Sequence, residues 1–342
     1  MDVLQKAFDE AVLLVSQEAK SEEELEKIAQ SIPSKMDEAI SRLPEDMLSS
    51  IKEMASEGLK ERRQLHSEFV NRNVKRWQKA FDLMELHVAV STEAGQLFNQ
   101  RLRPEAAAKN DILFDVLVRL HAKGCLISQN ICCLLKNGFA DGAHARWRAL
   151  HEINVTSMFL SRNGCEAAER YVYHEFVESY KAARQHREYQ PRLNEQGPSD
   201  EEFEQLKAEY NQVIERYGRE FKKPYGWATP FLDTGASNFF TLEKAVGLDH
   251  WRPYYKWASN NVHANVKSIR QCLGLSEAKE DILLVGPSNS GMTDPAHSMA
   301  ISLSQLTITL LLHELNLDGL VTMKLLLSLT DEIGEAFLEC DK

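Results

Sequence analysis

The chain has 342 residues, of which 43% are hydrophobic and 27% charged, a composition typical of a globular protein and not of a disordered one. Its formal net charge of −11 argues against a broad DNA-binding surface, which needs a basic face to neutralise phosphates. Because it has only 16 glycines and 10 prolines, the sequence favours long helices over many short strands. It predicts a mostly α fold, a large helical bundle.

The first part of the chain is an acidic segment, residues 1–59, with 14 acidic and 6 basic side chains. It predicts two or three short helices, with acidic residues in the first turn of one helix at 22–24, a break at Pro33 and a new helix at Pro44. We therefore divide the chain into an acidic N-terminal helical extension, residues 1–59, and a main helical bundle domain, residues 60–342. The extension is a candidate interaction arm for a protein partner.

The main domain is predicted to consist of helices joined by short loops, over residues 105–136, 141–162, 166–189, 200–221, 254–273, 296–315 and 318–338. Between the fourth and fifth of these, Gly, Pro and aromatic residues at 223–238 indicate an irregular segment that is suited to line a site. One β signal is present: the apolar run Ile-Leu-Leu-Val followed by a Gly-Pro-Ser-Asn-Ser-Gly turn predicts a short β-hairpin near residues 282–293.

The cysteines and the apolar runs indicate the cellular compartment of the protein and whether it has a membrane-spanning helix. The six cysteines include no C-x-x-C pair, which predicts reduced thiols in a cytoplasmic protein and no zinc site. The N-terminus lacks the basic start and apolar core of a signal peptide. The longest apolar stretch, residues 299–315, contains seven polar side chains, so we expect a buried core helix and no membrane span.

Polar side chains form one stripe on the predicted helix 141–162, at Asp141, His144, Arg148, His151 and Glu152. Arg148 and Glu152 are four residues apart and can pair. Arg148 can bind a phosphate or carboxylate bidentately, and His144 or His151 can act as an acid or base near neutral pH. The same stripe continues into core-type residues, so it also fits a buried ion pair that fixes the register of the helix.

Two other helices carry weaker groupings of polar residues. Ser259, His263 and Lys267 share a face of the predicted helix 254–273, which is poor in large apolar groups. A capped and partly exposed helix explains that composition as well as a binding site does. In the predicted helix 166–189, one face combines a tyrosine, a histidine and a glutamate, Tyr171, His174 and Glu178, a grouping that many amphipathic helices show.

Common catalytic motifs do not occur in the sequence. There is no G-x-x-x-x-G-K-[ST], G-x-G-x-x-G or G-x-S-x-G motif. His151-Glu152 and His174-Glu175 both lack the second histidine of an H-E-x-x-H zinc site. No pair of E-x-x-H motifs indicates a di-iron bundle, and we expect neither a metal nor a cofactor.

The string Arg146 to His151, RWRALH, contains an arginine and a histidine that are separated by four residues. It resembles the R-x4–6-H motif of the HEPN superfamily, small helical domains that include RNA-cleaving toxins and antiviral nucleases. In that family the motif usually comes from two chains that form a composite RNA site. The resemblance implies that Arg146 holds the scissile phosphate and His151 transfers a proton. The residue after the arginine is usually Asn, Asp or His in the family, and it is Trp147 here.

A second resemblance covers roughly residues 80–315. A helix of pattern G-A-x4-R-x3-E precedes a helix with S-x3-H and a short hairpin containing Gly-Pro, at Gly142, Ala143, Arg148, Glu152, Ser259, His263, Gly286 and Pro287. This combination resembles an uncharacterised bacterial family of helical proteins with no assigned function. It implies that Arg148, Glu152 and His263 belong together.

The leading hypothesis for function is a HEPN-like, metal-independent ribonuclease, or a degenerate relative of one, in bacterial stress or phage defence. RNA or a small phosphate-bearing ligand is then the partner, and a homodimer is expected from the HEPN analogy. The alternative is a non-catalytic helical protein that binds a small anionic ligand or a protein partner. The candidate catalytic residues are Arg148, His151, Glu152 and His263, and the candidate substrate-binding residues are Arg146, His144, Ser259 and Lys267.

Overall fold

The computed structural model describes residues 3–233, 237–264 and 266–341. It is mostly helical, as predicted, and residues in these ranges form no β-strand. The short hairpin predicted near 282–293 is therefore wrong. The apolar side chains that suggested it face solvent, Leu283 being 90% and Val285 95% exposed, and an isolated two-stranded hairpin is at best marginally stable. The backbone N–H of Ser288 instead donates to the carbonyl of Gly138, at 2.9 Å.

The chain divides into two compact units, residues 1–69 and 70–342. The first unit contains α1 (Val3–Glu18) and most of α2 (Glu22–Arg76). Helix α2 continues through Pro33 and Pro44, so the predicted break and restart at these positions are wrong. A proline removes one backbone hydrogen bond of a helix, and here that loss does not end the helix.

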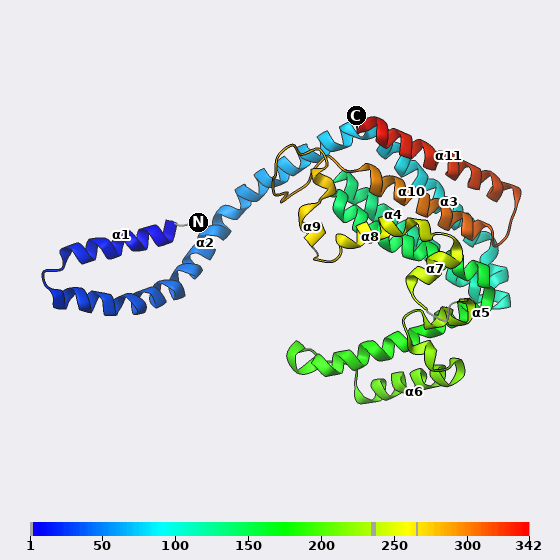
Figure 1. Ribbon diagram of the computed structural model, residues 1–342, viewed down its shortest axis with the longest axis horizontal. Coiled ribbons are helices and arrows are strands. Elements are labelled where there is room, and N and C mark those ends of the chain that lie inside the picture. The colour runs from blue at the N-terminus through cyan, green and yellow to red at the C-terminus, as the bar shows by residue number, and fades with distance from the viewer. Residues whose placement is uncertain (1–2, 234–236, 265, 342) are drawn as a thin grey trace. The chain divides into compact units, whose positions relative to one another are not determined.

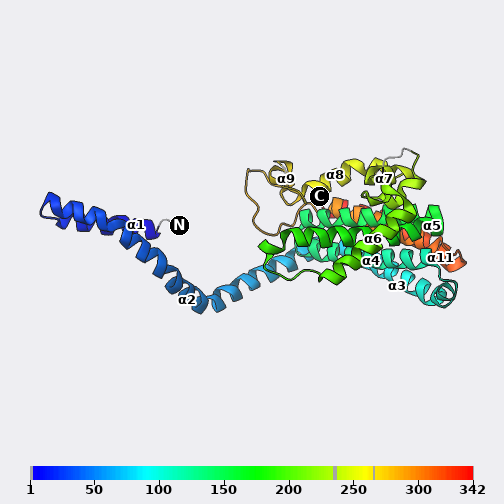
Figure 2. The ribbon, with the colours of Figure 1, turned by 90° about the horizontal axis from the view of Figure 1, so that it is seen from below.

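The second unit is built around long helices that lie side by side (Figures 1 and 2). They are α3 (Gln78–Lys109), α4 (Ile112–Lys136), α5 (Ala140–Leu193), α10 (Thr293–Leu311) and α11 (Leu317–Cys340). Helix α10 packs against the other four, which explains why the longest apolar stretch of the sequence is a core helix. In the described parts of the chain, each helix is too short or too polar to cross a membrane.

Helix α5 changes direction at Gly164, whose φ of 73° and ψ of −160° are not helical. A helix end was predicted at this point, and the structure confirms an interruption there. The first half of α5 carries the polar stripe that begins at Asp141. The second half leads to α6 (Asp200–Tyr217), which folds back on it.

Shorter elements follow α6, and several of them pack on α5. They are η1 (Arg219–Lys222), η2 (Gly226–Phe231), α7 (Phe239–Val246), η3 (Asp249–Trp251), α8 (Arg252–Asn260), α9 (Val266–Arg270) and η4 (Leu273–Leu275). The single helix predicted over 254–273 is thus divided into α8 and α9. The break follows two consecutive asparagines, Asn260 and Asn261, whose side chains compete for backbone hydrogen bonds and disfavour a helix interior. Helices α7 and α8 and turn η2 pack directly on α5.

Candidate functional site

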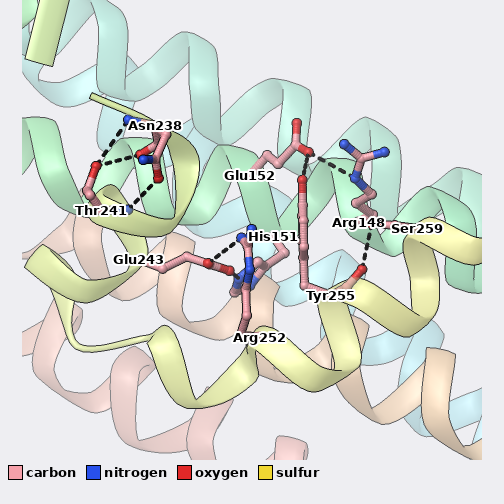
Figure 3. Close-up of polar contacts among 9 residues, drawn as sticks. All are labelled: Arg148, His151, Glu152, Asn238, Thr241, Glu243, Arg252, Tyr255 and Ser259. Atoms are coloured by element: carbon pink, nitrogen blue, oxygen red, sulfur yellow. Dashed lines mark hydrogen bonds and ion pairs between the residues drawn. The ribbon is translucent and has the colours of Figure 1, made fainter. Parts of the chain in front are cut away.

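The polar stripe of α5 faces α7 and α8, and Figure 3 shows the contacts that result. The hydroxyl of Tyr255 donates to Oε1 of Glu152 at 2.5 Å, and Nε of Arg148 lies 3.1 Å from the same oxygen. Burial, and then the bond to Glu152, raises the pKa of Tyr255 well above its usual range, so the hydroxyl keeps its proton. The predicted pairing of Arg148 with Glu152 is therefore present, with Tyr255 as a third member.

The guanidinium of Arg148 is held in place but not enclosed. Its central carbon lies 5.0 Å from the ring centroid of Tyr255, within the range of a cation–π contact, and 25% of the side chain is exposed. In Figure 3 the ion pair with Glu152 is drawn from Nε, and no dashed line joins either terminal nitrogen to the other residues drawn. This end of the arginine is suited to hold a ligand.

Directly beside this group, His151 is sealed in the core. Its Nε2 donates to Oε1 of Glu243 at 3.0 Å, and the two side chains are 2% and 0% exposed. The other carboxylate oxygen of Glu243 accepts from Arg252 at 2.7 Å. The imidazole is enclosed by aromatic rings, those of Trp147, Phe239 and Tyr255. His151 can therefore position Glu243, but it does not face a substrate.

His144 is also a core residue. It is fully buried, stacks on Trp147 with an interplanar angle of 14° and meets the edge of Trp257 at a centroid distance of 4.9 Å. Burial lowers the pKa of His144 to about 4, so the ring is neutral at physiological pH. Its position does not fit the predicted substrate-binding role.

Asp141 has a structural role at the start of the stripe. Its two carboxylate oxygens accept from the backbone N–H groups of Leu273 and Gly274, at 2.8 Å and 3.1 Å. Hydrogen bonds to an ionised acceptor are roughly twice as strong as neutral ones. The carboxylate thus fixes the turn η4, which follows α9, against the first turn of α5.

The second predicted grouping is not assembled as a helical face. Ser259 is in the last turn of α8 and donates to the carbonyl of Tyr255 at 2.7 Å. His263 lies in the turn after α8, is exposed, and lines a groove of about 670 Å³ together with Asp141. Lys267 belongs to α9. No polar contact joins His263 to Arg148 or Glu152 in the described ranges.

The arginine and histidine of the R-x4-H string are not brought together either. Arg146 is half-buried and, by helical geometry, points about 140° away from His151. Trp147, between them, is buried and donates from Nε1 to Ser302 at 2.9 Å. Arg146 has no ion pair with any residue that the structure describes.

Sequence reasoning missed Glu243, the buried carboxylate of the site. Its signal was present: Glu243 lies four residues after Phe239 and next to Leu242, so it shares the apolar face of α7. A charged residue on the buried side of a short amphipathic helix needs a partner. Among the described residues, no three His, Cys, Asp or Glu side chains gather as metal ligands do.

Comparison with known proteins finds one family model that matches part of the chain. Residues 114–281 match the model of a family of unknown function (DUF5677), which confirms the resemblance to an uncharacterised family. The match contains α5, α7, α8 and nearly all of α4, and so the whole arrangement around Arg148 and Glu243. No curated protein and no solved structure matches the chain, and none of these comparisons finds a relationship to the HEPN superfamily.

Proposed function

We propose that the protein binds a small phosphate- or carboxylate-bearing ligand on the α5–α8 face, with Arg148 as the anion-binding group. The observation that carries this proposal is how the guanidinium is held: Nε lies 3.1 Å from Oε1 of Glu152, the central carbon lies 5.0 Å from the centroid of the Tyr255 ring, and the terminal nitrogens point away from Glu152. A guanidinium that is already immobilised loses little conformational entropy on binding, and its fork suits a bidentate oxyanion.

A second arginine supports the same ligand class. Arg252 lies 5.0 Å from the centroid of the same Tyr255 ring, and 28% of its side chain is exposed. Glu152 and Glu243 each neutralise one of the two arginines, so the pair is stable without a ligand. An anion that binds here supplements these ion pairs and does not replace a missing partner.

The test is a titration of the full chain with three probes: inorganic phosphate, pyrophosphate and adenosine monophosphate. Arg148→Gln is expected to weaken binding about 10- to 100-fold, which corresponds to the loss of one or two charge-assisted hydrogen bonds. Arg146→Gln is the matched control, because it removes a half-buried arginine two positions away on the same helix. Absence of binding of all three probes, or equal losses in the two variants, contradicts the proposal.

A ribonuclease is the second candidate, and one observation favours it. His263 is exposed in a groove, where an imidazole can reach an RNA backbone, whereas His151 is sealed. In this version His263 transfers the proton, Arg148 binds phosphate, and His151 only positions Glu243. The predicted homodimer, the protein partner of residues 1–59 and the role in stress or phage defence remain predictions.

RNA cleavage and growth toxicity, measured for the natural chain, His151→Ala and His263→Ala, test this candidate. A ribonuclease predicts that His263→Ala abolishes cleavage while the variant keeps its circular dichroism spectrum. Equal RNA stability and equal growth in all three rule the ribonuclease out and leave the anion-binding proposal untouched.

A further inference from the structure

A second pocket lies away from the α5–α8 face, between α4, the second half of α5 and turn η2. Its volume is about 620 Å³, within the range of small-molecule sites. The side chains that matter for its chemistry are Leu120, Tyr171, His174, Glu175, Glu178 and Trp227. Three of them are the face that the sequence singled out on the helix 166–189. We call this cavity the Trp227 pocket.

The apolar wall of the pocket is rigid. Trp227 is 4% exposed and meets Tyr171 edge to face, at a centroid distance of 5.0 Å and an angle of 81°. On its other side Trp227 packs against Phe159, 5.6 Å away. Aromatic side chains fixed in this way offer a preformed surface to a flat or aliphatic group.

The polar wall presents hydrogen-bond acceptors. His174 is 8% exposed, and its Nε2 donates to the carbonyl of Lys223 at 3.1 Å. Burial lowers the pKa of His174, so the ring is neutral and Nδ1 carries a lone pair. Nδ1 lies 3.9 Å from Oε1 of Glu178, too far for a direct hydrogen bond. Two acceptors thus lie side by side on the pocket wall.

The charges around the pocket are only partly compensated. Glu178 also accepts from Lys181 at 2.9 Å, and Asp115 is shared between Arg103 and Arg119. Glu175 lines the pocket, is exposed, and has no ion pair in the described ranges. Among the residues that line the pocket, Asp115, Glu175 and Glu178 are acidic and Arg119 is basic, so the lining itself carries more negative than positive charge.

We propose that the Trp227 pocket binds a small organic amine, a molecule with a cationic N–H donor group on a flat or aliphatic apolar body. The ammonium group lies between Nδ1 of His174 and the carboxylate of Glu178, and it satisfies both acceptors at once. The apolar body rests against Trp227 and Tyr171. An anionic ligand is disfavoured, because it places negative charge beside the carboxylates of the rim.

Three indole probes that differ in charge test the proposal: tryptamine, which is cationic, tryptophol, which is neutral, and indole-3-acetate, which is anionic. Each is titrated calorimetrically into the full chain in an amine-free buffer. Tryptamine is expected to bind at least about tenfold more tightly than tryptophol, the difference of one charge-assisted hydrogen bond, and indole-3-acetate more weakly than either. Equal affinities for all three, or no binding of tryptamine at millimolar concentration, overturn the proposal.

Two variants on the same helix locate the binding. Glu178→Gln removes the charge from the pocket wall and is expected to weaken tryptamine binding about tenfold or more. Glu188→Gln removes an exposed glutamate outside the pocket and is expected to leave the affinity unchanged. Both side chains are exposed, so both variants should fold. Equal affinity of the two variants for tryptamine contradicts the assignment to this pocket.

Discussion

His151 of α5 and Glu243 of α7 are joined by a hydrogen bond of 3.0 Å from which solvent is excluded on both sides. Arg252 binds the second carboxylate oxygen and connects the buried pair to the partly exposed surface of α8. These three side chains tie α7 and α8 to the first half of α5. The position of Tyr255, and through it that of Arg148, depends on this connection.

Glu243→Ala is expected to destabilise the protein by about 3–5 kcal/mol, because it leaves His151 and Arg252 without their shared acceptor. Urea unfolding followed by circular dichroism measures the loss. Glu243→Gln keeps the volume and one acceptor oxygen, and should cost less than Glu243→Ala. If Glu243→Ala unfolds at the same urea concentration as the natural chain, the pair does not have this structural role.

Acid should destabilise the protein through its buried histidines. Burial lowers the pKa of His87, His121 and His144 from 6.5 to about 4 in the folded state. Between these values the unfolded chain binds more protons than the folded one, so stability is complete above pH 6.5 and decreases as the pH falls. Each histidine contributes a slope of about 1.4 kcal/mol per pH unit.

Urea unfolding at pH 7.5, 6.5, 5.8 and 5.2 measures this dependence. His144→Phe keeps an aromatic ring against Trp147 and removes one of the three groups. Its slope should therefore be about 1.4 kcal/mol per pH unit smaller. A stability that stays constant from pH 7.5 to 5.2, or an unchanged slope in His144→Phe, contradicts the account.

Gly291 is a position where a methyl group is not accommodated. Its φ is +77°, and a Cβ atom there would lie 2.3 Å from the carbonyl oxygen of Leu273. We expect Gly291→Ala to cost about 2–4 kcal/mol, from backbone strain together with displacement of the turn that Asp141 holds. Hydrogen exchange of residues 273–291 should accelerate in this variant.

Gly286→Ala is the matched control for that substitution. It lies in the same loop, and its Cβ would meet no atom within 4 Å, so its effect should stay within about 0.5 kcal/mol. Equal destabilisation by the two substitutions excludes the contact with Leu273 as the cause.

Cys132 and Cys133 are neighbours in the sequence and should differ in reactivity. Burial raises the pKa of Cys132 to about 12, whereas Cys133 is exposed. Iodoacetamide followed by mass spectrometry should modify Cys133 and the exposed Cys165 in the native protein. Cys132 and Cys125, whose pKa burial raises to about 11, should react only in urea. Modification of Cys132 in the native state contradicts the packing described for α4.

The helical fold was predictable because periodicity within one helix is a local property. The pairing of Arg148 with Glu152 followed from a spacing of four residues, and the interruption of α5 followed from Asn163-Gly164. The prediction of a hairpin at 282–293 was wrong because a β-strand needs a neighbouring strand for its backbone hydrogen bonds, and a local sequence pattern does not show whether that neighbour is present. The apolar side chains that suggested the hairpin face solvent, and the backbone N–H of Ser288 donates to the carbonyl of Gly138 in the turn before α5.

The candidate site was only partly predictable, for a related reason. Tyr255 and Glu243 belong to segments more than 90 residues away from their partners on α5. The spacing of residues along the sequence does not predict contacts between segments so far apart. His151 and His144 look alike on a helical stripe, and only the packing of Trp147, Trp257 and Phe239 shows that both are enclosed. Burial, which decides whether a histidine can meet a substrate, is a property of the assembled helices.

Gly164, where α5 is interrupted, allows the cost of backbone strain to be measured apart from the cost of side-chain packing. A Cβ atom added at Gly164 meets nothing within 4 Å, yet its φ and ψ lie in a region that is almost restricted to glycine. An alanine at this position therefore changes the torsional energy of one residue and no packing. The change in the free energy of unfolding caused by Gly164→Ala therefore measures the cost of backbone strain alone. This position lies between the part of α5 that carries Arg148 and the part that lines the Trp227 pocket.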